Sequence, residues 1–282
     1  MTTKKTVLHW INGEWIDTDS HRDSINPATS EVIGTYADGN VAVADKAIAA
    51  ALDAFQNSAW KRDHALRARV LEELAVAFEK HTDELIEQLS LENGKIKPEA
   101  TFEVNMVPSK LRYFAALALT EYGRSGTPAP DVLSILLREP MGVAGIIVPW
   151  NSPIALMVRS LAAALAAGCT AVIKMPGQTA QINGLLSEVM SEVPSLPRGV
   201  INLFSEAGAE GSKQLIVSPD VPVISFTGST ATGRAIAAIG AQRLKRMGLE
   251  LGGKTPHLIF DDVDLEVALP VLEKTITVFA GQ

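Results

Sequence analysis

The spacing of apolar and polar residues divides the chain into three stretches. In residues 1–40, short apolar runs are separated by turn-forming pairs such as Asn12-Gly13, a pattern typical of short strands and hairpins. From residue 41 to 121, apolar residues recur every three or four positions, which predicts a mostly helical block. The third stretch begins near Val143, where short apolar runs alternate with amphipathic segments.

Two segments join the helical block to the third stretch. Residues 123–130, GRSGTPAP, are rich in glycine and proline and predict a linker. The run Val132–Arg138 that follows is typical of a strand and ends at Glu139-Pro140. We therefore expect the chain to leave the helical block here and to begin a new substructure.

The third stretch predicts a parallel sheet. Alternation of strands and helices implies an α/β, Rossmann-like parallel sheet with helices on both faces. Sheets of this kind bind ligands at the carboxyl ends of their strands. The expected strands are 143–148, 170–174, 200–204, 223–226, 247–251 and 257–260, and the expected helices are 152–168, 179–193, 208–217, one reaching about residue 240, and 264–278.

Composition and charge exclude several classes of protein. The 282 residues carry a net charge of −7 and no run rich in Lys or Arg, so no nucleic-acid or anionic-membrane partner is expected. The start of the chain lacks the apolar core of a signal peptide. Arg159 and Gly168 interrupt the apolar stretch 153–173, which we interpret as core and not as a membrane span. The single cysteine, Cys169, cannot form an internal disulfide, which fits a reducing compartment, and we expect a cytoplasmic protein.

Four polar segments each follow a predicted strand, and the first two carry Asn151 and Lys174. The side-chain amide of Asn151 can donate a hydrogen bond to a developing oxyanion. From spacing alone, a helix N-cap is the favoured interpretation of this asparagine. Lys174 can hold ribose hydroxyls or a phosphate, but a solvated loop lysine is favoured when the residue is taken alone.

The other two segments are Phe226–Gly233 and Leu249–Lys254. In the first, glycines and hydroxyl residues lie between a strand and a helix start, where backbone N–H groups and the helix dipole favour a phosphate. The spacing is not GxGxxG, so a plain turn also fits. In the second, Glu250 lies inside an apolar strand, where burial would make it a stronger base, as a general base requires. An edge-strand glutamate that faces water fits equally well.

Taken together, the four segments resemble the aldehyde dehydrogenase superfamily. The match is close at PWN, at the strand-Lys-x-Pro region, at FTGST followed by a glycine, and at ELGGK. It extends more loosely from WINGEW and NPAT near the start to Gly281-Gln282. The resemblance implies NAD or NADP as cofactor and an aldehyde as substrate, which is oxidised to a carboxylic acid through a thiohemiacetal and a thioester on a cysteine.

The resemblance also implies roles for single residues. Asn151 matches the asparagine that holds the thiohemiacetal oxyanion, and Glu250 matches the glutamate that activates the cysteine or the hydrolytic water. Lys174 matches the lysine on the adenosine ribose. The implied cofactor-binding positions are Val148, Pro149, Trp150, Lys174, Gly177, Gly208, Phe226, Thr227, Gly228, Ser229, Gly233, Leu251 and Gly252.

The same resemblance predicts how the chain is organised. The nucleophile would follow Gly281-Gln282 by one or two residues, so this chain alone is expected to be inactive. The full-length protein is expected to be a homodimer or homotetramer. The implied parts are an NAD(P)-binding domain of residues 1–123 and 142–252, a bridging and oligomerisation segment of residues 124–141, and the start of a catalytic domain at residues 253–282.

The chain departs from the family pattern at the expected ribose and adenine positions. Gly177 stands where many NAD-preferring members carry a glutamate, and the loss of that carboxylate removes repulsion of a 2′-phosphate. We therefore expect NADP to be tolerated or preferred. Glu206 replaces the first glycine of a Gly-x-Gly turn while Gly208 keeps the second, so the loop beside the adenine is expected to differ in shape. Cys169 is expected to be a buried, inert thiol.

Two alternatives remain open from sequence. One is a nucleotide-binding or interaction module without catalysis. The other is a different Rossmann-type reductase, which predicts no role for Asn151 or Glu250. The five histidines have no metal-ligand spacing, so no metal site is expected. Positions Val104–Arg112 and Met157 are expected to line the substrate tunnel. The acidic residues Asp261, Asp262 and Asp264 are expected to end a strand and cap the following helix.

Overall fold

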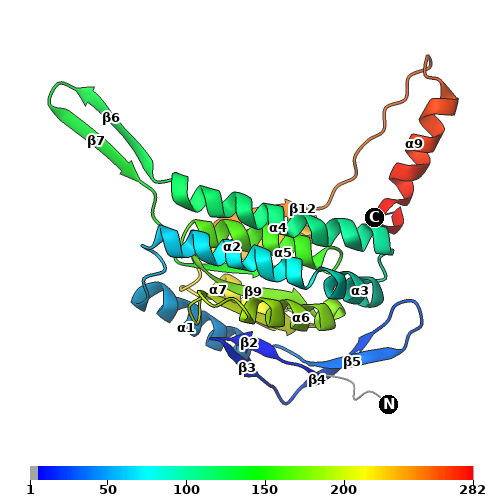
Figure 1. Ribbon diagram of the computed structural model, residues 1–282, viewed down its shortest axis with the longest axis horizontal. Helices are drawn as coiled ribbons and strands as arrows, with labels where there is room; N and C mark the ends of the chain where they lie inside the picture. Colours follow the sequence, from blue (N-terminus) through cyan, green and yellow to red (C-terminus); the bar gives the residue numbers. More distant parts are fainter. Residues whose placement is uncertain (1–5, 282) are drawn as a thin grey trace.

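A seven-stranded sheet forms the centre of the structure, a computed structural model that describes residues 6–281 (Figure 1). Five neighbouring strands of this sheet are mutually parallel, and two short strands from the start of the chain are added antiparallel at one edge. This parallel core confirms the predicted α/β class. The strands lie in the order β12 (Arg246–Leu251), β11 (Val223–Gly228), β8 (Val143–Ile147), β9 (Thr170–Pro176), β10 (Ile201–Glu206), β2 (His9–Ile11) and β3 (Glu14–Ile16).

Helices cover both faces of this sheet, as predicted (Figure 1). One group of helices packs on each face, and the members of both groups are given at the end of this paragraph. Ile146 and Ile173 belong to the core between the sheet and the first group, and Ile147 and Val172 belong to the core between the sheet and the second group. Because successive side chains of a strand point to opposite faces, a continuous apolar run fills both cores. The first group is α2 (His64–Lys80), α3 (Thr82–Asn93), α4 (Lys97–Thr120), α5 (Pro153–Ala166) and α6 (Ala180–Ser191), and the second is α1 (Val41–Asn57), α7 (Glu210–Val217) and α8 (Thr230–Ala241).

The turn-rich start of the chain forms short strands, as its pattern predicts. Asn12 and Gly13 both have positive φ, 55° and 73°, and make the tight turn between β2 and β3. Two successive residues with positive φ match the right-handed twist of a hairpin. A separate three-stranded sheet has the order β1-β5-β4 and consists of β1 (Thr6–Val7), β5 (Val32–Ala37) and β4 (His21–Ile25).

The predicted helical block of residues 41–121 is confirmed as α1 to α4. The side chain of Asn40 accepts a hydrogen bond from the Val43 N–H and so caps α1. Asp63 caps α2 in the same way. Helix α3 ends at Gly94, whose φ of 77° lies in the left-handed region that glycine adopts without strain.

The apolar stretch 153–173 is divided between α5 and β9, which confirms its interpretation as core. Gly168, with a φ of 86°, makes the turn between them. No helix within residues 6–281 is both long and apolar enough to cross a membrane.

The predicted linker at residues 123–130 is wrong. This segment forms β6 (Gly123–Ala129), which pairs antiparallel with β7 (Val132–Leu137) in a hairpin that projects from the body of the molecule (Figure 1). Glycine and proline are tolerated here because a two-stranded hairpin has only edge strands, where a missing N–H is harmless. The turn uses Asp131 in the left-handed region, with a φ of 63°.

The predicted strand at residues 257–260 is also wrong. Its residues have no regular secondary structure, and Leu258 and Phe260 are largely exposed. An apolar run forms a strand only where a neighbouring strand accepts and donates its backbone hydrogen bonds. The segment instead runs from β12 to α9 (Leu265–Thr277), where Asp264 accepts from the Glu266 N–H and caps the helix as predicted. A short 3₁₀ turn, η2 (Val278–Gly281), follows.

Three buried carboxylates, here called the capping glutamates, close the starts of the helices that follow β8, β9 and β10. Glu103 accepts hydrogen bonds from the first turn of α5, Glu92 from that of α6, and Glu206 from that of α7. The N-cap residues of these helices make no side-chain capping bond of their own. A carboxylate at a helix N-terminus satisfies open N–H groups and favours the helix dipole.

Candidate functional site

The carboxyl ends of the parallel strands bring the predicted polar segments to one edge of the sheet. Asn151 follows β8, Gly177 follows β9, and Glu206 ends β10. Ser229 follows β11, and Glu250 lies next to the end of β12. Because β11 lies between β8 and β12, the loop with Asn151 and the strand with Glu250 are separated by one strand. This edge is where doubly wound sheets bind their ligands.

Asn151 lies in the loop between β8 and α5 and does not cap the helix. The N-cap is Ser152, which makes no capping bond, and the first turn is bonded to Glu103 instead. The capping interpretation, favoured from spacing, is therefore wrong. Asn151 lines a cavity of about 420 Å³ that Phe279 and Gly281 also line. An amide at a cavity wall is suited to hold an oxyanion.

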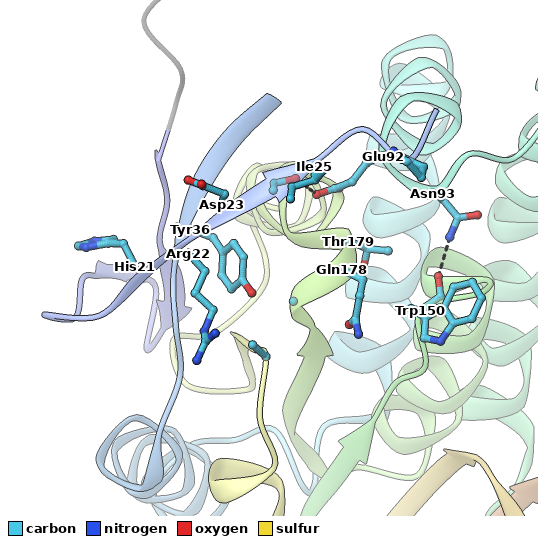
Figure 2. Close-up of a pocket in the computed structure, with 14 residues that line it drawn as sticks. His21, Arg22, Asp23, Ile25, Tyr36, Glu92, Asn93, Trp150, Gln178 and Thr179 are labelled. Atoms are coloured by element: carbon cyan, nitrogen blue, oxygen red, sulfur yellow. Dashed lines mark hydrogen bonds between the residues drawn. The ribbon is translucent and has the colours of Figure 1, made fainter. Parts of the chain in front are cut away.

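The residues before Asn151 run from the core to the surface. Val148 is buried and its N–H donates to the Lys174 carbonyl, which extends the β8–β9 pairing by one residue. Pro149 is half-buried, whereas Trp150 is 50% exposed. The Trp150 carbonyl accepts a hydrogen bond of 2.6 Å from the Asn93 side chain, shown as a dashed line in Figure 2. The indole is thus presented beside a second, larger cavity.

This larger cavity, of about 730 Å³, opens between the end of β9 and the small N-terminal sheet (Figure 2). Trp150, Gly177 and Tyr36 line it. A Cβ added at Gly177 would lie 2.2 Å from the Tyr36 Oη and 3.1 Å from the Ala207 Cα. Glycine is therefore required while Tyr36 keeps its place. Burial, aided by the Asp38 charge, raises the pKa of Tyr36 to about 12, so its hydroxyl remains a donor at neutral pH.

Lys174 lies inside β9 and is half-buried, so the interpretation as a solvated loop lysine is wrong. Burial lowers the pKa of its ammonium, and the carboxylates of Glu206 and Asp38 act in the opposite direction. Asp38 in turn accepts hydrogen bonds from Arg22 and from the Ala207 N–H. Asp38 thus interacts with both Arg22 and Lys174, and of these residues Arg22 lines the larger cavity.

Glu206 gives the loop between β10 and α7 its shape, and the sequence resemblance predicts this loop to lie beside the adenine. Its carboxylate, 1% exposed, accepts from the N–H groups of Gly211 at 2.7 Å and Ser212 at 3.2 Å. Gly208 lies exposed in the turn between the strand and α7. The sequence predicted that this loop differs from the family pattern because Glu206 replaces a glycine. In the structure the glutamate caps helix α7, which a glycine at position 206 cannot do.

Helix α8 begins without any of the capping glutamates. Its N-cap Ser229 accepts from the Thr232 N–H at 3.2 Å, a local cap. A Cβ at Gly233 would lie 2.4 Å from the Leu251 Cδ2, so α8 approaches β12 closely. Among the helices that follow β8, β9, β10 and β11, only α8 has no distant carboxylate bonded to its N-terminus. It is the one whose dipole is free to face a phosphate.

The neighbouring predicted positions differ in exposure. Phe226 is buried, and a Cβ at Gly228 would lie 2.5 Å from its Cζ, so the strand end is tightly packed. Thr227 is half-buried, whereas Leu251 and Gly252 are exposed at the end of β12. These residues form the rim of the site near the edge strand.

Glu250 faces water from the edge strand β12, with its side chain 64% exposed. Of the two alternatives left open from sequence, this is the edge-strand glutamate that faces water, because the described residues place no strand beyond β12. Arg159 on α5 lies 3.6 Å from Glu250 and donates to the Thr227 hydroxyl at 2.9 Å. This arginine therefore links α5 to β11 and to the edge strand β12, although the ion pair is solvated and weak.

Cys169 lies at the opposite edge of the sheet from Asn151, just before the amino end of β9. It is 5% exposed, and burial raises the pKa of its thiol, while the N–H groups of Met141 and Gly142 oppose the shift. Position and burial both disqualify it as the nucleophile for this site.

We expect the Cys169 thiol to react with a disulfide reagent such as DTNB roughly 100-fold more slowly in the folded chain than in urea, because the thiolate is disfavoured and covered. Stopped-flow absorbance in both conditions measures the ratio. Equal rates would show that the thiol is accessible in the native state.

Several residues of this region were not found from sequence. Arg159 was noted only as a charge that interrupts an apolar stretch, and Tyr36 lies 141 positions before Gly177, outside any local motif. Lys95 and Glu103 lie in the predicted helical block, which gave no reason to single them out. Their spacing of eight residues gave no signal, because Lys95 lies before α4, outside the helix that carries Glu103.

Comparison with known proteins identifies the family of this chain. Residues 15–282 match the family model described as the aldehyde dehydrogenase family. Aldehyde dehydrogenase 1 of Tanacetum cinerariifolium is 38% identical over 93% of this chain and 53% of its own length. Betaine aldehyde dehydrogenase of Bacillus subtilis is 37% identical over 97% of this chain and 56% of its length. The chain thus spans about half the length of these relatives.

Solved structures give the same result. The NAD+ complex of an aldehyde dehydrogenase from Bacillus cereus superposes with a TM-score of 0.94 at 32% identity, covering 99% of this chain and 57% of that one. The NAD-dependent aldehyde dehydrogenase of Sinorhizobium meliloti gives 0.93 at 33% identity, over 99% and 56%. With fold, family model and relatives in agreement, the chain belongs to the aldehyde dehydrogenase family.

Proposed function

We propose that this chain provides the cofactor-binding part of an enzyme that oxidises an aldehyde to a carboxylic acid with NAD+ or NADP+. The observation that supports this most is the meeting of Asn151, Lys174 and the open N-terminus of α8 at one sheet edge. A relative solved as an NAD+ complex and a relative named as NADP-dependent support both forms of the cofactor.

The residues present fit a dinucleotide. The 730 Å³ cavity offers an exposed indole, Trp150, and the half-buried Lys174 lies on β9, three residues before Gly177 of the cavity lining. The start of α8 supplies N–H groups for a pyrophosphate, and position 177, which lines the cavity, carries no side chain. When bound, NAD(P)+ supplies the hydride acceptor.

Two side chains then act on the aldehyde. The Asn151 amide donates a hydrogen bond to the carbonyl oxygen as negative charge develops on it, which stabilises the tetrahedral state. Glu250 accepts a proton from the attacking group or from the water that releases the acid. Its open position on β12 leaves it free to approach the reacting atoms. The nucleophile is proposed to follow Gln282, and a homo-oligomer is proposed for the full-length protein.

Cofactor titration tests the proposal. We expect NAD+ and NADP+ both to bind by isothermal titration calorimetry, and Lys174→Met to weaken binding about tenfold through loss of a charged contact. As a control, Lys80→Met, on the exposed face of α2, should leave the affinity unchanged. Failure of the wild-type chain to bind either nucleotide would refute the proposal. Binding without aldehyde oxidation in the full-length protein would favour a non-catalytic module.

The preference between the two nucleotides depends on position 177. We expect NADP+ to bind within about tenfold of NAD+, because no carboxylate at that position repels its 2′-phosphate. Introducing one by Gly177→Glu should weaken NADP+ at least about tenfold relative to NAD+. Since Tyr36 blocks a side chain there, the variant is made with Tyr36→Phe, and Tyr36→Phe alone is the control. NAD+ binding more than tenfold tighter in the wild type would overturn this preference.

A further inference from the structure

The corner where α3 ends and α4 begins holds the loop that carries Asn151. Lys95 lies at this corner with its side chain 4% exposed, and Glu103, two turns along, is 3% exposed. The Lys95 ammonium pairs with Glu103 Oε2 and also donates to the Asn151 carbonyl at 2.8 Å and to the Ser152 hydroxyl at 3.1 Å. One buried cation thus bonds two successive residues of the loop.

The other oxygen of Glu103 holds the next part of the loop. Oε1 accepts from the N–H groups of Ile154 at 3.0 Å and Ala155 at 3.1 Å. The buried pair therefore fixes the chain on both sides of Pro153, from the Asn151 carbonyl to the first turn of α5. Hydrogen bonds to charged groups are shorter and stronger than those between neutral groups, so the attachment is stiff.

The same corner contacts the segment on the far side of the smaller cavity. The Lys95 ammonium lies 5.3 Å from the Phe279 ring centre, and the Phe279 N–H donates to Glu99 at 2.7 Å. Asn93 holds the Trp150 carbonyl from the same corner. Both walls of the cavity that Asn151 lines are thus attached to one short stretch, residues 93–103.

Stability alone does not account for a buried ion pair. Desolvation of two charges offsets much of their attraction, and an apolar pair of similar volume is often as stable. What the pair adds is a set of directed hydrogen bonds to the loop, which an apolar pair cannot make. Preorganised donors are what an oxyanion site requires.

We propose that Lys95 and Glu103 are positioning residues that hold Asn151 in the orientation needed to bind the oxyanion. The inference rests on the proposed function of Asn151 for its chemical meaning. Its structural content, a loop locked by a buried ion pair, can be measured separately.

The test is hydrogen–deuterium exchange of the full chain, read by mass spectrometry, together with NAD+ and NADP+ affinity. In the double variant Lys95→Met/Glu103→Gln, both charges are removed while the glutamine oxygen can still accept from α5. We expect amide exchange in residues 150–156 to rise about tenfold, with strands β9 and β10 unchanged, because only the local opening is affected. Nucleotide affinity should fall about threefold, because Trp150, which lines the larger cavity, belongs to the same loop and would be held less firmly.

The matched control is Lys80→Met/Glu192→Gln, which removes an exposed pair between α2 and the residue after α6. It should leave residues 150–156 unchanged. If the double variant at Lys95 and Glu103 leaves exchange unchanged, or raises it equally throughout the domain, the positioning role is overturned. If exchange rises locally but the wild type binds no nucleotide, the loop attachment stands and the proposed function fails.

A milder variant keeps the inference testable if the double variant does not fold. Ser152→Ala removes one contact of Lys95 and leaves the buried pair intact, and Ser152 makes no capping bond. We expect an increase of about threefold in exchange at residues 150–156. No increase would count against the proposal.

Discussion

Replacing Glu92 with leucine is expected to lower the free energy of unfolding by about 4 kcal/mol. The carboxylate, on a residue 3% exposed, accepts from the Ser24 hydroxyl and from the N–H groups of Gln181 at 2.9 Å and Ile182 at 2.8 Å. Leucine fills a similar volume but leaves these three donors without an acceptor. An unsatisfied buried donor costs about 1–3 kcal/mol, which sets the size of the effect.

Urea unfolding followed by circular dichroism measures this change. Glu92→Gln is the matched control: its single carbonyl oxygen keeps part of the cap, so we expect about half the loss. Because Glu92 also lines the larger cavity beside Thr179, the leucine variant should weaken nucleotide binding in parallel. A loss below about 1 kcal/mol for leucine would show that water replaces the carboxylate at the start of α6.

Lowering the pH from 7 to 4 is expected to destabilise the fold by about 3 kcal/mol through His9 alone. Burial lowers the pKa of His9 to about 4, although Asp38 and Asp17 act to raise it. The unfolded chain binds a proton near pH 6.5, whereas the folded chain does not. Stability is therefore complete above pH 6.5 and falls as the pH drops from about 6.5 to about 4.

A variant without the imidazole isolates this contribution. His9 is 1% exposed, packs edge-on against Phe204, and its Nδ1 accepts from the Ser205 N–H at 3.4 Å. In His9→Gln, the amide oxygen can accept from the same N–H, and the difference in stability between pH 7 and pH 4 should shrink by about 3 kcal/mol. The same loss in wild type and variant would mean that other groups cause it. His257→Gln, at an exposed position between β12 and α9, is the control and should leave the pH dependence of stability unchanged.

Patterns within short stretches of sequence predicted those helices, strands and turns that depend on interactions between nearby residues. The Asn12-Gly13 hairpin, the helical block and the strand-helix alternation all follow from spacing within about ten residues, and the structure confirms them. The two wrong elements, at 123–130 and 257–260, fail for one reason. Strand formation depends on a partner, and composition does not reveal whether one is present.

The chemistry of the site was predicted less completely than the fold. The polar segments at strand ends were found because each sits in a short motif. The residues that hold them were not, since Glu103 bonds to Ile154 across 51 positions and Glu92 to Gln181 across 89. The sequence left Glu250 open between a buried strand and an edge strand, because an apolar run does not reveal whether a further strand lies beside it, and the structure places β12 at the edge.

The capping glutamates also bear on how this chain can be divided. Two of them, Glu92 and Glu103, come from the N-terminal helices but complete helices of the parallel sheet. A fragment beginning at β8 would expose the amide groups of Ile154, Ala155, Gln181 and Ile182 to a void that water must fill. The parallel-sheet part of this chain is therefore not an interchangeable module. If it were joined to the N-terminal helices of another protein, those helices would have to place one carboxylate at the start of α5 and one at the start of α6.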